Sequence, residues 1–130
     1  MDGDAACTQC HVGPNLTDER YHNTGVGTDR SNPDLGGYTV TNNEKDKGAF
    51  KTPTLRDVEK RGPYMHDASL KSLPDVVSFY NRGGTKNPWL SGEIQPLDLT
   101  GKERADLVLF LEALSGEISP EASRPPVLPK

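Results

Sequence analysis

The sequence is poor in hydrophobic residues and has no long hydrophobic run. Only 32% of its 130 residues are hydrophobic, and no apolar run approaches the roughly 18 residues that a membrane-spanning helix needs. We therefore expect no membrane span. So little aliphatic side chain cannot fill a generous core, and a large apolar cofactor at the centre would make up the shortage.

Positive charge is also scarce. The chain has 15 Lys and Arg residues against 19 Asp and Glu residues, which gives a net charge of -4, and the basic residues are scattered. A nucleic-acid-binding protein concentrates basic residues on one face, so this composition excludes nucleic acid as a partner. Residues 1–4 lack the charged and apolar regions of a signal peptide.

Glycine and proline, by contrast, are abundant. The 13 glycines and 11 prolines together exceed the ordinary share of about 12%, so much of the chain is expected to be loop. The longest loop is predicted over Asn23–Gly48, with at most one short helical turn. No internal repeat is visible. The length suits one domain, which we place at residues 1–116, followed by a C-terminal tail over residues 117–130.

Two segments carry helix signals. The first helix is predicted to begin after an N-cap at Ser72 and to run to about Tyr80, because a proline and an aspartate occupy its first turn. The second opens with a capping box formed by Thr100 and Glu103 and ends before Gly116. The first helix also has apolar residues spaced to share one face, namely Leu73, Val76, Val77 and Tyr80.

The segment Cys7–His11 reads Cys-Thr-Gln-Cys-His, which is the attachment pattern of a c-type haem. In this pattern two thiols add to the two vinyl groups of the haem, and the adjacent histidine is an axial ligand of the iron. Two other readings are a disulfide between the only two cysteines and half of a zinc site. Zinc would need two further ligands, whereas His22 and His66 lie far apart in the sequence. The motif therefore predicts one covalent haem c with His11 as a ligand.

Four side chains are candidates for the sixth ligand of the iron: Met65, His66, His22 and Tyr80. From chemistry alone Met65 leads, because Met opposite His is the usual pair in electron-carrying cytochromes c; its other role would be to fill a gap in an irregular core. Tyr80 is the second candidate, because a haem packed on the apolar helix face would meet its phenol. An ordinary half-buried tyrosine with a hydrogen-bonded hydroxyl is the other reading.

Haem of the c type is normally attached after export. A chain without a leader is therefore expected to be a mature, recloned or truncated sequence, and we expect a periplasmic protein.

Several separate segments recur in the order found in one known family. They are Cys7–His11 with Gly13–Asn15, Phe50–Arg56, Pro63–Asp67, Val76–Tyr80 with Gly83–Gly84, and Leu97–Thr100. With these segments, residues 7–115 resemble the C-terminal haem domain of the bacterial di-haem cytochrome c peroxidase and MauG family. The resemblance implies an all-α fold, a cytochrome c-like haem domain with long irregular loops.

The resemblance also changes the ranking of the sixth ligand. In that family the ligand lies seventeen residues after the proline that aligns with Pro63, and this position is Tyr80 here. Many members have Met there and MauG has Tyr, so the chain resembles the MauG branch, and Tyr80 is preferred over Met65. A phenolate ligand stabilises ferric over ferrous iron and lowers the reduction potential.

The implied function is that of the six-coordinate, electron-relay half of a MauG-like di-haem peroxidase, an oxidoreductase that passes on oxidising equivalents from hydrogen peroxide. Its implied partners are a peroxidatic haem domain or subunit and a redox partner protein. With one haem motif, this chain alone is not expected to be a competent peroxidase. The alternatives are a stand-alone single-haem electron carrier with His/Met ligation and a haem sensor with a labile sixth position.

Four further positions take a role from the resemblance. The backbone carbonyls of Arg61 and Pro63 map onto a calcium site of the family, which would be partial here because the other domain supplies a ligand; carbonyl oxygens suit a hard cation. His66 maps onto a histidine near the haem, or is a loop histidine. Arg56 would pair with a haem propionate, or form a surface ion pair. Ala68 stands where the family often has Gly, so the local turn is expected to differ.

Overall fold

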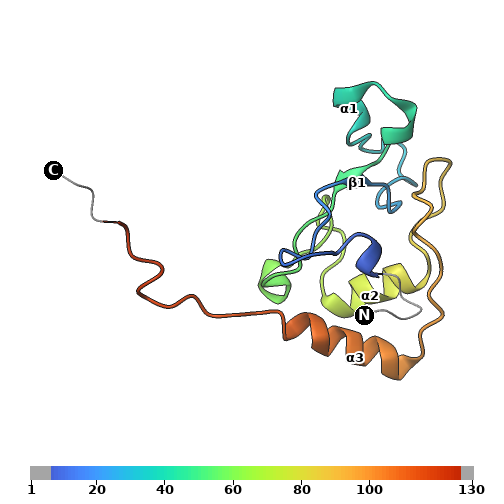
Figure 1. Cartoon of the computed structure of the whole chain (residues 1–130). Coiled ribbons are helices and arrows are strands. Elements are labelled where there is room, and N and C mark those ends of the chain that lie inside the picture. The colour runs from blue at the N-terminus through green and yellow to red at the C-terminus, as the bar shows by residue number, and fades with distance from the viewer. Residues whose placement is uncertain (1–6, 127–130) are drawn as a thin grey trace.

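The computed structural model describes residues 7–126, which form short helices joined by long loops (Figure 1). In chain order the elements are the 3-10 turn η1 (Cys7–Gln9), strand β1 (Tyr21–His22), helix α1 (Tyr38–Thr41), 3-10 turn η2 (Glu44–Asp46), strand β2 (Phe50–Lys51), 3-10 turn η3 (Val58–Arg61), and helices α2 (Leu73–Asn81) and α3 (Gly101–Glu112). The prediction of an all-α fold is wrong, because only three α-helices are present in this part of the chain and a two-stranded sheet accompanies them. The domain is small and cytochrome c-like.

The sheet joins two segments on either side of the long loop. Strands β1 and β2 are antiparallel, with His22 opposite Phe50, and the N–H of Thr52 donates to the carbonyl of Arg20 at 2.8 Å. Strands of two residues are too short to show the alternation of apolar and polar residues that marks a strand in a sequence. The sheet was therefore invisible in the sequence.

The loop between these strands, residues 23–48, contains two short helical elements, α1 and η2. The prediction of at most one short helical turn in this loop is therefore wrong, because the loop contains two. Helix α1 has no side-chain cap, and its four residues give no apolar periodicity, whereas Asn43 accepts a hydrogen bond from Lys45 N–H to begin η2.

The predicted N-cap at Ser72 and the predicted capping box at Thr100 are both present, and Ser72 also forms a capping box. In α2 the hydroxyl of Ser72 accepts from the N–H of Asp75, whose carboxylate accepts from the N–H of Ser72. Thr100 and Glu103 make the same pair of hydrogen bonds at the start of α3. Helix α3 ends at Glu112, three residues before the expected stop.

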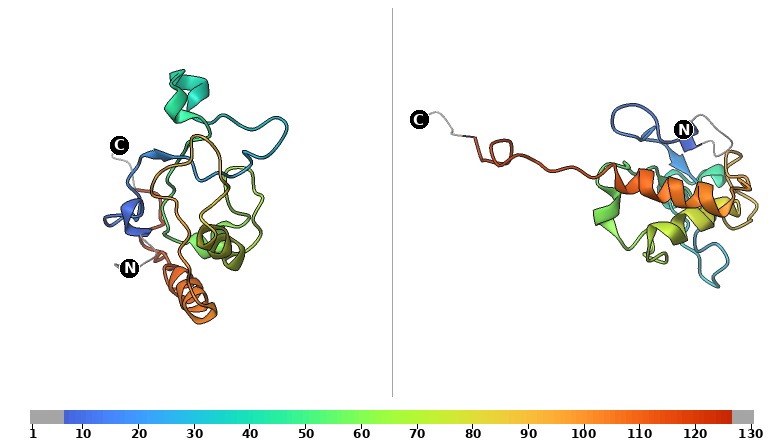
Figure 2. Two further views of the ribbon diagram at one scale, coloured as in Figure 1. Left: turned by 90° about the vertical axis from the view of Figure 1, so that its right-hand side faces the viewer. Right: turned by 90° about the horizontal axis from the view of Figure 1, so that it is seen from below.

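Helices α2 and α3 pack against each other and form the main apolar core (Figures 1 and 2). Leu73 and Val77 of α2 are buried against Leu111 of α3. The predicted apolar face of α2 is therefore divided, since Leu73 and Val77 serve the contact with α3 and Tyr80 lies outside this cluster. The buried aromatic residue of α2 is Phe79, which the periodicity did not select.

Asn23 holds the loops around the sheet together. Its side chain is almost completely buried, donates to the carbonyl of Lys47 at 2.6 Å and accepts from the N–H of Gly25 at 2.8 Å. Gly25 has a positive φ, and a Cβ atom there would overlap the carbonyl oxygen of Thr85. The turn after β1 is thus packed backbone to backbone against the segment that follows α2.

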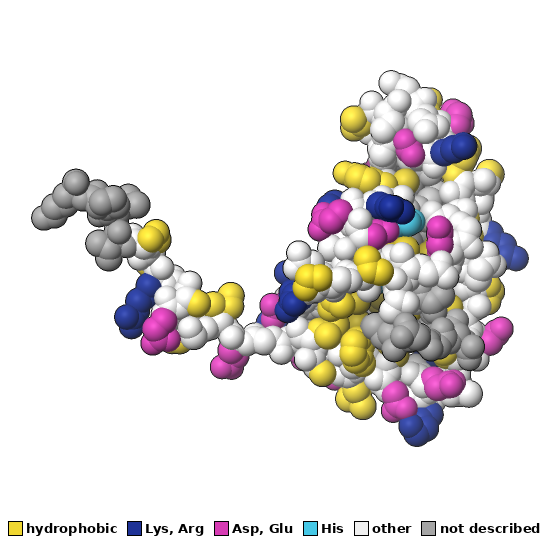
Figure 3. Space-filling model, viewed as in Figure 1, with side chains coloured by type: hydrophobic (Ala, Val, Ile, Leu, Met, Phe, Trp, Pro, Cys, Tyr) yellow, Lys and Arg dark blue, Asp and Glu magenta, His cyan; other side chains and the backbone are white. Residues whose placement is uncertain are grey.

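The remaining surface is mixed in character. Lys, Arg, Asp and Glu side chains are interspersed on the face seen in Figure 3, and hydrophobic side chains gather near the place where the C-terminal segment leaves the body. Residues 117–126 are exposed and run away from the body (Figure 1). No helix in residues 7–126 is long and apolar enough to cross a membrane.

Candidate haem site

The two cysteines of the haem motif lie on one tight turn. The N–H groups of Cys10 and His11 donate to the carbonyl of Cys7 at 3.4 and 2.9 Å, so the segment winds as the 3-10 turn η1. In a 3-10 helix, residues i and i+3 lie one above the other, which places the Cys7 and Cys10 side chains on the same side of the turn. No disulfide joins them. This local geometry suits attachment to two vinyl groups of one ring.

His11 is oriented by a hydrogen bond to the backbone. Its Nδ1 lies 2.9 Å from the carbonyl oxygen of Leu16, which suits a neutral ring protonated at Nδ1 and leaves Nε2 to bind a metal. Burial lowers the pKa of His11, although the Leu16 contact acts in the opposite direction. A neutral imidazole is the form that ligates iron, so His11 fits the role of axial ligand.

Tyr80 lies in the same neighbourhood as the two thiols. Burial, followed by the charges of Cys10 and Cys7, raises the pKa of Tyr80 to about 12. The Tyr80 side chain is half-buried. An imidazole nitrogen and a phenol oxygen are both ligands that haem iron takes in proteins, so His11 and Tyr80 would be a suitable donor set for it. The sequence-predicted residues of the motif and of α2 are thus brought together.

Met65 and His66 lie in the loop that precedes α2. Met65 is half-buried and has a φ of 70°. His66 is exposed, and its ring stacks on Phe50 of β2, with ring centroids 3.6 Å apart and an interplanar angle of 9°. Phe50 covers one face of the His66 ring, and this packing is what we expect of a histidine with a structural role in a loop.

The other residues named by the resemblance are exposed. The Nε of Arg56 donates to the carbonyl of Pro14 at 2.8 Å, so its guanidinium ties down the loop that follows His11. Arg61 ends η3, and Pro63 follows it after one residue. In the described part of the chain no cluster of three or more His, Cys, Asp or Glu side chains gathers at Arg61 and Pro63.

One cluster was missed by the sequence analysis. The Sγ of Cys10, a carboxylate oxygen of Asp18 and a ring nitrogen of His22 all lie within 4.8 Å of one another. Burial raises the pKa of the Cys10 thiol, and the charge of Asp18 contributes, to give a value of about 11. The sequence analysis weighed His22 as an iron ligand and as a distant zinc ligand, but nothing in the sequence marks Asp18, because a spacing of four residues has meaning only on a helix. These three donors lie close enough together to bind a zinc ion. Such a site would use Cys10 and would not include Cys7, unlike the zinc site considered from the sequence.

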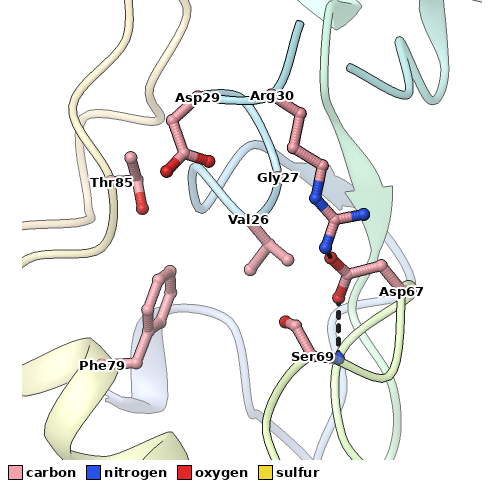
Figure 4. Close-up of a pocket in the computed structure, with 8 residues that line it drawn as sticks. All are labelled: Val26, Gly27, Asp29, Arg30, Asp67, Ser69, Phe79 and Thr85. Carbon is pink, nitrogen blue, oxygen red and sulfur yellow. Dashed lines mark hydrogen bonds and ion pairs between the residues drawn. The ribbon is translucent and has the colours of Figure 1, made fainter. Parts of the chain in front are cut away.

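A cavity of about 330 Å³ lies on another side of α2 (Figure 4). Phe79 and Val26 form apolar parts of its wall, and the ion pair between Arg30 and Asp67, 2.6 Å long, forms a polar part. None of Cys7, Cys10, His11 and Tyr80 lines this cavity. Adjacent residues on a helix point about 100° apart, so α2 directs Phe79 into the cavity and Tyr80 elsewhere.

Ala68→Gly is expected to stabilise the protein by about 0.5–1 kcal/mol. Ala68 has a φ of 57°, a left-handed conformation that costs an L-residue about 1–2 kcal/mol, and the larger backbone entropy of unfolded Gly offsets part of the gain. Denaturant unfolding measures the change. Ala105→Gly, an exposed position in α3, is the matched control and should destabilise by about 1 kcal/mol. A loss of stability in Ala68→Gly would contradict the inference that the left-handed backbone conformation of Ala68 is strained.

The chain was compared with known proteins. No family model matches it. It is 43% identical to the methylamine utilization protein MauG of Methylorubrum extorquens, over 98% of this chain and 35% of that protein. It is 38% identical to the cytochrome-c peroxidase IdrP1 of Denitromonas iodatirespirans, over 88% of this chain and 38% of that protein.

A solved structure is also similar. A MauG-like protein associated with microbial copper homeostasis matches with a TM-score of 0.81 and 32% identity, over 92% of this chain and 46% of that chain. The chain thus spans little more than a third of the length of the curated relatives it matches.

Proposed function

Because this chain belongs to the bacterial cytochrome c peroxidase and MauG family, we propose that it is a haem c electron-transfer domain, the six-coordinate half of a MauG-like di-haem enzyme. The observation that carries the proposal is the shared neighbourhood of Cys7, Cys10 and Tyr80, with His11 oriented beside them. A bound haem c supplies an iron atom that alternates between ferric and ferrous states.

Residues from two elements, η1 and α2, would hold the haem. Cys7 and Cys10 bond to the ring from η1, and His11 presents Nε2 from the same segment. Tyr80, on α2, would bind the iron as a phenolate. Since burial holds the pKa of Tyr80 at about 12, the phenol proton leaves near neutral pH only in exchange for the metal.

The wider function follows from the family. We infer a periplasmic location, a peroxidatic haem domain or subunit as partner, and a redox partner protein that receives the oxidising equivalents. A calcium ion bound partly by the carbonyls of Arg61 and Pro63 belongs to the same proposal, and so do the contacts of Arg56 and His66 with the haem.

We expect the isolated chain, loaded with haem, to react slowly with hydrogen peroxide. Peroxide must bind the iron to be cleaved, and His11 with Tyr80 leaves no open position. Stopped-flow mixing with peroxide measures the rate from the haem absorbance. The same measurement on a longer gene product that includes a peroxidatic haem domain should show a fast reaction that reaches this haem.

Tyr80→Ala is the control for this experiment. It opens the sixth position in the isolated chain and should speed the reaction with peroxide several-fold. A fast, stoichiometric reaction of the unmodified isolated chain would refute both the ligation by Tyr80 and the relay role.

A further inference from the structure

Asp18 and His22 form a half-buried pair beside the haem motif. The carboxylate oxygen of Asp18 lies 2.7 Å from Nε2 of His22, and their side chains are only 10% and 17% exposed. The Sγ of Cys10 lies within 4.8 Å of both groups. A haem attached through Cys10 would therefore have this pair next to its edge. Strand β1 holds His22 in place through its pairing with β2.

The surroundings of Asp18 keep its carboxylate ionised. One oxygen accepts from the backbone N–H of Arg20 at 3.0 Å, and the other is bound by His22. Burial alone would raise the pKa of Asp18, but these hydrogen bonds outweigh it and hold the pKa well below its usual range. Because its side chain is only 10% exposed, water screens the charge of Asp18 less than it screens the charge of a fully exposed carboxylate.

We propose that the Asp18–His22 pair tunes the haem held at Cys10 toward the ferric state. The inference rests on the proposed haem attachment and adds two residues to the site. A ferric haem carries one more positive charge than a ferrous haem, so a nearby anion stabilises the ferric form. Asp18 thus acts in the same direction as a Tyr80 phenolate, from the side of η1, and helps to retain oxidising equivalents at this haem.

Glu19 provides a matched control within the same segment. It is the next residue in the chain and carries the same charge, but its side chain is 62% exposed and pairs with Lys51 at 2.6 Å. An exposed and paired carboxylate acts weakly on its neighbours. Removing the charge of Glu19 should therefore leave the haem almost unchanged, although the change in net charge equals that for Asp18.

The test compares Asp18→Asn with Glu19→Gln in the full haem-bearing chain. Each protein is held at one applied potential in a spectroelectrochemical cell, and the ratio of ferrous to ferric haem is read from the visible spectrum. Asp18→Asn should raise this ratio about tenfold, a size typical of one weakly screened charge near the metal. Glu19→Gln should change it less than about twofold. Raising the salt concentration should leave the Asp18 effect largely in place.

Two more variants separate the effect of the Asp18 charge from any effect of the substitution on folding. Asp18→Glu keeps the charge and should keep a ratio close to that of the unmodified chain. The double variant Asp18→Asn with His22→Gln replaces the hydrogen-bonded pair by two amides that can still share a hydrogen bond, and it should raise the ratio as Asp18→Asn does.

The results separate the inference from the function on which it rests. Suppose that Asp18→Asn or the double variant retains haem and its ferric spectrum, but has the same ratio of ferrous to ferric haem as Glu19→Gln. That result would overturn the tuning role. If the unmodified chain carries no covalent haem after maturation, the proposed function fails, and the tuning role fails with it.

Discussion

Cys10→Ala is expected to reduce covalently bound haem to less than about a tenth of the amount in the unmodified chain. Each thioether needs its own thiol, and Cys10 both supplies one and stands next to His11, so its loss removes an attachment and weakens the approach of the ligand. The unmodified chain should keep its haem through acid acetone extraction. Its mass under denaturing conditions should exceed that of the polypeptide by one haem.

The control for this prediction comes from within the motif. Gln9 lies between the two cysteines and is exposed, so Gln9→Ala should retain the haem. Haem that acid acetone removes from the unmodified chain would contradict covalent attachment. Metal analysis of the same sample tests the zinc reading, because zinc bound by Cys10, Asp18 and His22 would appear with no haem present.

Tyr80→Phe is expected to change the ferric visible spectrum and to raise the reduction potential by on the order of 100 mV, since axial ligands set the potential over a wide range. The substitution removes only the phenol oxygen. The ring can keep its edge-to-face contact with Phe79, whose centroid lies 5.6 Å away, so the fold of α2 should be retained. Spectra and a redox titration of the purified protein measure both changes.

Met65→Leu is the comparison variant, because it removes the other candidate ligand and keeps a similar volume. With Tyr80 bound to the iron, Met65→Leu should leave the ferric spectrum nearly unchanged. Loss of a far-red sulfur-to-iron band in Met65→Leu would identify Met65 as the ligand. The chain would then be the His/Met electron carrier, the alternative function.

Features that depend on neighbours in the chain were predicted well. The N-cap of α2 and the capping box of α3 were recognised because each joins a side chain to a backbone group three residues away. The family was recognised from several short motifs in order, and the comparisons confirm it. Both results rest on local residue patterns, which are complete in the sequence.

Features that depend on distant segments were not predicted. The all-α fold class was wrong, because β1 and β2 lie on either side of a long loop and are too short to carry a pattern. The apolar face of α2 was treated as one surface, yet its members Leu73 and Val77 belong to the contact with α3. Periodicity tells which residues share a face, and it does not tell which partner covers that face.

The sequence by itself determined the attachment motif Cys7–His11 and the two main helices, because adjacent residues create them through bonds and hydrogen bonds of short range. Only the tertiary structure decided what surrounds the motif. It brings Tyr80 from α2 into the neighbourhood of both cysteines, and it sets the Asp18–His22 pair beside Cys10. These placements depend on how loops close and pack, and a fixed charge or a ligand acts only through its distance in space.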